Sequence, residues 1–309
     1  MIKKNSICLM FCLLLATTGI YAQQVNGLLG KALTERTQPA PESVFRKFRE
    51  AGMKPVNHIL TVSEKEKLNK AFSFLPPLHQ KILKEHLSSV SFMDNMPNTA
   101  LTSPVETTGP EKMFNITFRA EILNQTISEW ATWKENSCYV QPENNDYQVT
   151  IEAGKLDAMV YILLHEATHV VDAVLNITPH PDDFDALVAP TPFTADIWSK
   201  INKPKEKATS ALLETTRFRS GKPVLISSAQ KVYEALKETP FASLYSMASW
   251  HEDLAEILTI YHLTQKMGQP YRILVNKNGV NVFVYEPFIN KQVINRQSLL
   301  AMFYTPYKL

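Results

Sequence analysis

Residues 160–175 read VYILLHEATHVVDAVL and are apolar at most positions. A segment of this length without glycine or proline, apolar on nearly all sides, predicts an α-helix buried in the interior of a domain. Two histidines and a glutamate interrupt the apolar pattern. Such groups are costly to remove from water unless partners compensate them, so they point to chemistry inside the core.

The chain before this helix changes from helical to strand-like periodicity. Capping patterns and apolar spacing predict helices at 41–51, 63–72, 78–87 and 127–135, the second of them opened by a capping box of Ser63 and Glu66. Near alternation of apolar and polar positions predicts strands at 89–92, 114–122, 138–140 and 147–151. We expect these strands to form one sheet that packs on the buried helix, with an edge strand along a cleft.

The chain after residue 175 predicts a polar loop and then a mostly helical lobe. The loop covers 176–192, and helices are expected at 193–202, 205–218, 228–237, 249–267 and 295–303. Two strands, 271–275 and 280–285, flank Asn276-Lys-Asn-Gly279, a hairpin signal. The order of elements predicts an α+β fold in which a small mixed sheet packs on the buried helix and a mostly helical lobe follows.

The N-terminus has the pattern of a secretory signal. Lys3 and Lys4 precede an apolar run at 7–15, and Ala22 ends a cleavage site, so residues 1–22 are expected to be a signal peptide. Ile20 departs from the small-residue pattern of such a site, which leaves an uncleaved anchor as the alternative. The segment is too short for a membrane span, and we expect a secreted or periplasmic protein with no stable span after cleavage. Residues 23–57 mix glycine, proline and charge, which predicts a leader or loosely packed arm.

Composition narrows the possible partners. The chain has 32 basic and 30 acidic residues, and removal of Lys3 and Lys4 leaves 30 of each, so nothing predicts binding to nucleic acid. Hydrophobic residues make up 45% of the chain, enough for a large core. Of the three cysteines, Cys8 and Cys12 lie in the signal. Cys138 is then alone and cannot form an intrachain disulfide.

The buried helix carries an HExxH motif. His165 and His169 are four residues apart, so they project from one face and can bind one Zn²⁺ ion at about 2.0–2.1 Å. Glu166 lies roughly 100° around the helix. From there it can reach a water on the open side of the metal, which is the position of a general base.

A catalytic zinc site needs a third protein ligand. A histidine added shortly after the motif is absent, because Asp172 and Leu175 occupy the relevant positions. Residues 249–256, SWHEDLAE, offer Glu252 from a separate helix. Two alternatives stay open: Ser249 and Glu252 are also spaced as a capping box, and His251 is a rival ligand.

Two further carboxylates are placed to support the ligands. Glu256 lies one turn after Glu252 and could accept the outer N–H of a ligand histidine. Asp172 shares a helical stripe with both histidines, so it could orient an imidazole or contact the loop beyond the helix.

Two weaker hypotheses concern other metals. His79 and His86 lie seven residues apart on one expected helix, although surface histidines explain this spacing equally well. Asp182, Asp183 and Asp185 suggest calcium in the loop, but the loop lacks the glycine and the terminal glutamate of an EF-hand.

The sequences HEATHVVD, at 165–172, and YSMASWHEDLAE, at 245–256, resemble the paired motifs of the zinc peptidases related to anthrax lethal factor. The resemblance covers about 20 residues and implies a zincin-like fold of the gluzincin type, in which the third ligand is a glutamate. It also implies the roles of five residues: zinc ligands His165, His169 and Glu252, general base Glu166, and Tyr245 as an oxyanion-stabilising hydroxyl.

These observations together predict an exported zinc metallopeptidase with one catalytic domain at 58–309 and a peptide or protein substrate. Two alternatives remain. One is a non-catalytic module of zincin fold that binds at the cell surface, and the other is a zinc amidase that acts on cell-wall peptide.

Overall fold

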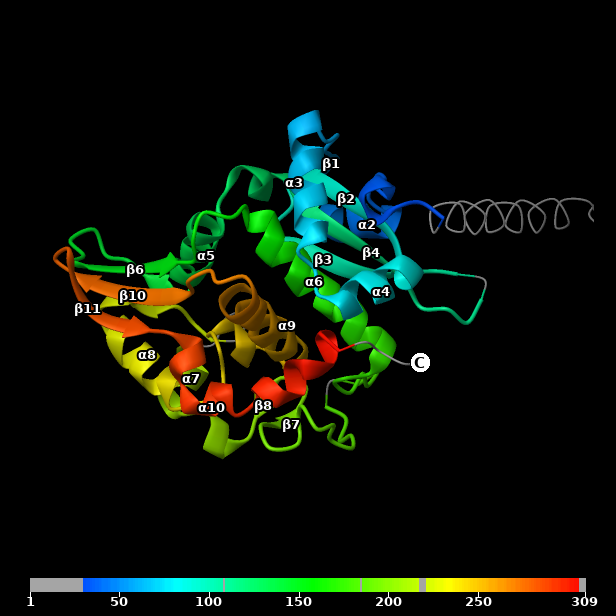
Figure 1. The fold of residues 1–309 in the computed structure, drawn as a ribbon. Helices are drawn as coiled ribbons and strands as arrows, with labels where there is room; N and C mark the ends of the chain where they lie inside the picture. The colour runs from blue at the N-terminus through cyan, green and yellow to red at the C-terminus, as the bar shows by residue number, and fades with distance from the viewer. Residues whose placement is uncertain (1–29, 108, 184, 217–220, 306–309) are drawn as a thin grey trace, which may run out of the picture.

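The computed structural model describes residues 30–107, 109–183, 185–216 and 221–305, and its architecture is α+β. Helix α6, Ala158–Leu175, runs diagonally through the molecule, with one sheet and several helices on each side of it (Figure 1). It begins two residues earlier than predicted. It ends at Asn176, whose φ of 51° is left-handed, a conformation that asparagine tolerates at a helix end. Most of its residues are buried, as the apolar pattern predicts.

A four-stranded sheet lies on one side of α6. Its order is β1-β2-β4-β3, with β2 parallel to β4 and β3 antiparallel to β4. The strands are β1, Val56–Asn57; β2, Leu87–Asp94; β3, Ala100–Val105; and β4, Met113–Arg119. The predicted strands at 89–92 and 114–122 are confirmed in β2 and β4, although β4 ends early and residues 120–124 form a 3-10 helix. The edge strand β3, which contacts α6, was not predicted.

A second sheet has the order β11-β10-β6, so the expectation of one sheet before α6 is wrong. Strand β6, Tyr147–Glu152, pairs with β10, Arg272–Lys277, and β10 pairs with β11, Val280–Tyr285. Asn278 and Gly279 form the predicted hairpin turn, with φ values of 49° and 74°. The predicted strand at 138–140 is a short β5, Tyr139–Val140, which pairs with β9, Val224–Leu225.

Three helices before α6 contact it directly: α3, Val62–Ser73; α4, Pro77–His86; and α5, Ile127–Asn136. All three were predicted. The start of α3 differs, because the capping box is formed by Thr61 and Glu64 and not by Ser63 and Glu66. Thr61 accepts the backbone N–H of Glu64, and the Glu64 carboxylate accepts the backbone N–H of Thr61 at 2.8 Å.

The part of the chain after α6 is less helical than expected. Residues 193–202 form turns and strand β7, Trp198–Lys200, which pairs with β8, Lys203–Pro204. The region 205–218 contributes a 3-10 helix at Glu206–Ala208 and the short α7, Ala211–Thr216, to the described residues. The indole of Trp198 is buried and donates to Asp253 at 2.9 Å. This tertiary contact outweighs the weak helical pattern of the segment.

The remaining predicted helices are present. Helix α8, Ala229–Lys237, matches its expected range. Helix α9, Trp250–Tyr261, continues as a π-helical turn at His262–Lys266. The last predicted helix, 295–303, is a 3-10 helix at Gln297–Phe303, and the short α10, Lys291–Ile294, which was not predicted, precedes it.

The described part of the N-terminal arm packs closely on the domain. This packing differs from the loosely packed arm that the composition of residues 23–57 predicts. Its elements are a 3-10 helix at Leu33–Glu35, α2 at Glu42–Glu50, and β1. Phe48 is buried against Met93 and Met96. Arg36 is 1% exposed and donates to the carbonyls of Leu83, at 3.2 Å, and Lys84, at 2.9 Å. These carbonyls belong to the last turn of α4, where helices leave acceptors unpaired.

The predicted signal peptide, residues 1–22, lies outside the described residues. Within the described part of the chain, α6 is the one helix long and apolar enough to span a membrane by length and composition, and 78% of it is buried inside the protein. Burial of this kind is expected of a core helix.

The arm can be tested through Arg36. We expect Arg36→Met to lower the free energy of unfolding by about 3 kcal/mol, because the α4 carbonyls lose their charged donor in a buried place. Urea denaturation would measure the change. Arg46→Met, an exposed arginine of α2, is the matched control and should change stability by less than about 0.5 kcal/mol. Equal stability of the two variants would contradict a docked arm.

Candidate metal centre

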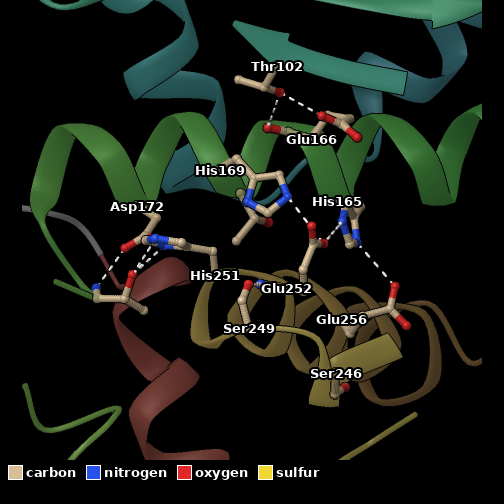
Figure 2. A network of polar contacts seen from close by, with 12 residues as sticks. Thr102, His165, Glu166, His169, Asp172, Ser246, Ser249, His251, Glu252 and Glu256 are labelled. Carbon is tan, nitrogen blue, oxygen red and sulfur yellow. Dashed lines mark hydrogen bonds and ion pairs between the residues drawn. The ribbon is translucent and has the colours of Figure 1, made fainter. Parts of the chain in front are cut away.

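Helices α6 and α9 pack together and bring His165, His169 and Glu252 to one point (Figure 2). Oε2 of Glu252 lies 3.0 Å from Nε2 of His165 and 3.6 Å from Nε2 of His169. One donor atom from each residue falls within 4.8 Å of the others, so the three side chains could hold a metal ion. The predicted ligand set therefore comes together in space, although Glu252 is 87 residues from His165 along the chain.

The start of α9 explains why the Glu252 carboxylate is available. Ser249 caps the helix by accepting the backbone N–H of Glu252 at 3.2 Å. The reciprocal half of a capping box, a bond from the Glu252 carboxylate to the backbone of Ser249, does not form in this cap. The carboxylate instead turns toward the two imidazoles. Ser249 therefore caps the helix while the Glu252 side chain stays available to the candidate centre.

Glu256 lies behind His165, as predicted for a supporting carboxylate. Its Oε1 is 3.1 Å from Nδ1 of His165, which is an ion-pair contact and not a well-aligned hydrogen bond. The same carboxylate is 3.2 Å from Nζ of Lys134 and accepts the hydroxyls of Tyr161, at 2.8 Å, and Ser243, at 2.6 Å. Four partners thus fix a carboxylate that is 1% exposed. The Glu256 carboxylate, fixed in this way, in turn orients the His165 ring.

The charges of this site perturb one another. Burial alone would raise the pKa of Glu256, but the charge of Lys134 and the contacts with His165 and Ser243 outweigh it and lower the pKa to about 2. Burial alone would lower the pKa of His165, but Glu252 and Glu256 outweigh it and raise the pKa to about 9. Burial alone would raise the pKa of Glu252, but its contacts with His165 and His169 outweigh this effect and lower it. Such a negative environment suits a cation.

Glu166 points away from the ligand cluster, toward the edge strand β3 (Figure 2). Oγ1 of Thr102, on β3, donates to Oε2 of Glu166 at 2.7 Å and is 3.2 Å from the Glu166 carbonyl. The side chain thus lies beside the metal-binding face without joining it, as the 100° rotation between neighbouring helix positions requires.

Tyr245 lies in a 3-10 turn, Tyr245–Met247, just before α9. Its ring stacks on that of His165, with centroids 5.8 Å apart and planes at 19°. Nζ of Lys134 is 3.8 Å from the centre of the same ring. The predicted hydroxyl donor is therefore adjacent to a predicted ligand.

These groups line one cavity of about 680 Å³, a volume within the range of small-molecule binding sites. Its wall includes Glu166, Tyr245, the three ligand residues, the segment 97–102 that enters β3, and two tryptophans of α5. Sequence reasoning did not identify Thr102 and Lys134, which lie in β3 and α5 and carry no recognisable motif.

The contacts of Asp172 differ from those expected of a residue that orients a ligand. It accepts the backbone N–H of Thr178 at 2.7 Å and the Thr178 hydroxyl at 2.6 Å, and it contacts His180 and His251. These contacts lower the pKa of Asp172 although burial would raise it. His251, the rival ligand, belongs to this second group and not to the cluster around Glu252.

The weaker metal hypotheses are not supported. His79 is a buried residue whose Nε2 is 3.0 Å from Oγ1 of Thr168, and burial lowers its pKa to about 3. His86 contacts the carbonyl of Lys112 instead. Asp185, from the candidate calcium loop, pairs with Lys200 at 2.8 Å. None of these residues, nor Asp182 or Asp183, joins a metal-capable group in the described parts of the chain.

Comparisons of this chain with protein-family models, with curated proteins and with solved structures found no match.

The role of Glu256 gives a first test of the centre. Glu256→Gln keeps the shape but removes the charge beside His165, and we expect it to weaken zinc binding by about 10- to 100-fold. Competition with a chelator of known affinity would measure this, with circular dichroism to confirm folding. The control Glu238→Gln, on the surface after α8, should bind zinc as the unaltered protein does. An unchanged affinity in Glu256→Gln would exclude a supporting role.

Proposed function

We propose that this chain is an exported zinc-dependent metallopeptidase of zincin-like fold that hydrolyses peptide bonds. The observation that carries the proposal is the donor set of two imidazoles and one carboxylate, the set of a glutamate-type catalytic zinc site. The distances of 3.0 Å and 3.6 Å from Glu252 to the two imidazole nitrogens bracket the spacing of about 3.3 Å between ligands in a tetrahedron with zinc bonds of about 2.0–2.1 Å.

A zinc ion in this site would polarise the scissile carbonyl and make a water molecule more acidic. Glu166 then serves as general base and takes the proton of the attacking water. Thr102 donates to the Glu166 carboxylate, and both residues line the cavity that contains the candidate ligands. Tyr245, stacked on His165, offers its hydroxyl to the oxygen that gains negative charge.

The edge of β3 supports a peptide as the substrate. β3 is the last strand of its sheet, and residues 97–102 line the same cavity as the ligands. An extended peptide can add to such an edge through main-chain hydrogen bonds. A substrate held in this way would place its backbone beside Glu166, because Thr102 and Glu166 are in contact.

The first test of the reaction replaces the base. We expect Glu166→Gln to bind zinc normally and to lose about 10²- to 10⁴-fold in kcat, because no group accepts the proton of water. A peptide-library digest read by mass spectrometry would measure the activity, and metal analysis would count the zinc. The surface variant Glu206→Gln is the control and should be fully active.

Equal turnover by the unaltered protein and Glu166→Gln would refute the role of the base. No hydrolysis by the unaltered protein with zinc bound would favour a non-catalytic binding module. A parallel digest of cell-wall material separates the third possibility, because products there but none from the peptide library would identify a cell-wall amidase.

A second test concerns the hydroxyl of Tyr245. Tyr245→Phe keeps the ring that stacks on His165 and removes only the proposed donor. We expect kcat to fall by up to about 10²-fold with KM nearly unchanged, as for loss of one oxyanion donor. Steady-state kinetics on a peptide found in the library digest would show this. A fall confined to KM would instead indicate that Tyr245 binds substrate in its ground state.

A further inference from the structure

A second group of side chains beside the first could also hold a metal ion: Asp172, His180 and His251. Nε2 of His180 lies 3.4 Å from Oδ2 of Asp172, and Nδ1 of His251 lies 2.9 Å from the same oxygen. The rings of His180 and His251 stack with centroids 4.6 Å apart. All three residues line the cavity that contains the first centre.

The two groups share a donor set and a spacing. In each, one carboxylate oxygen faces two imidazole nitrogens, at 3.0 Å and 3.6 Å in the first and at 2.9 Å and 3.4 Å in the second. Tetrahedral zinc ligands with bonds of about 2.0–2.1 Å lie about 3.3 Å apart. A small change in the distances between the carboxylate oxygen and the imidazole nitrogens would therefore let either group bind the same kind of ion.

Three separate parts of the chain build the second group. Asp172 comes from the C-terminal part of α6, His180 from the segment after α6, and His251 from the first turn of α9. The Asp172 side chain is only 2% exposed, whereas those of His251 and His180 are 21% and 31% exposed. A buried carboxylate with two imidazoles at its solvent side gives an ion a route of entry.

Thr178 fixes the carboxylate in place. Its backbone N–H donates to Oδ1 of Asp172 and its hydroxyl to Oδ2. Carboxylate ligands of metals are commonly hydrogen-bonded in this way. The donor types exclude calcium as the natural occupant, because calcium prefers six to eight oxygen ligands and imidazole suits zinc and its neighbours.

We propose that Asp172, His180 and His251 bind a second divalent ion, of the zinc class, which ties the segment after α6 to the start of α9. The segment next to Glu252 would then be fixed by a metal as well as by the cap at Ser249. The proposal requires no hydrolysis and stands whether or not the first centre is catalytic.

Two contacts of His251 define the competing explanation: its Nδ1 lies 2.7 Å from the Thr178 hydroxyl, and its Nε2 faces the indole of Trp250. The indole N–H of Trp250 is 3.1 Å from Nε2 of His251 and 3.0 Å from the carbonyl of Pro179. If it donates to Nε2, the His251 proton sits on Nδ1 and the group is a hydrogen-bond network. With a metal on Nδ1, the indole would bond to Pro179 alone. A second metal site and a hydrogen-bond network therefore predict different numbers of ions bound by the protein.

The experiment counts zinc in the purified, folded protein. We expect two equivalents in the unaltered chain, one in His180→Ala and one in His169→Ala, measured by titration and elemental analysis. Loss of a ligand should weaken the second site by at least the tenfold that loss of a supporting hydrogen bond costs. His86→Ala removes a histidine outside both groups and should keep two equivalents.

A second readout guards against an indirect effect. Zinc should raise the midpoint of thermal unfolding of His169→Ala, which keeps the second group, but not that of the double variant His169→Ala with His180→Ala. His180→Cys supplies a thiolate ligand and should restore the second equivalent. Saturation of the unaltered chain at one equivalent, or two equivalents in His180→Ala, would overturn the proposal in favour of a hydrogen-bond network alone.

Discussion

The candidate centre depends on a row of opposite charges buried between α5, α6 and α9. Lys134 faces Glu256, Glu256 faces His165, and His165 faces Glu252. None of these groups could be taken from water alone without a large cost, and each is stabilised by its neighbour in the row. The row also fixes positions, because moving one member would expose a buried charge on the next. The packing of α6 on α5 and α9 thus holds the three donor atoms close together.

Local features of the fold could be predicted from sequence, because they depend on residues close together in the chain. The apolar pattern of 160–175 identified α6, and the Asn278-Gly279 turn identified the β10–β11 hairpin. The candidate ligands His165 and His169 follow from helical spacing alone. Glu252 could be predicted only from a second motif, on another helix. The spacing of Ser249 and Glu252 could not show that the Glu252 carboxylate turns away from the cap and toward the imidazoles.

The features that were missed depend on contacts between distant segments. Strand β3 carries threonine, serine and proline, a weak strand pattern, and exists as the partner of β4. Lys134 has no recognisable pattern in the sequence, and its role depends on its contact with Glu256, which lies 122 positions away on α9. His180 lies in a proline-rich loop whose acidic residues suggest calcium, yet the residues of this loop that contact Asp172 are Thr178 and His180.

The pairing of β6 with β10 has a consequence for how the chain folds during its synthesis. The paired residues Glu152 and Arg272 are 120 positions apart, so the sheet cannot close until nearly all of the polypeptide has been synthesised. Contacts of such long range slow folding, because a large loop must be ordered first. Until residues 272–277 have been made, β6 therefore lacks its partner strand.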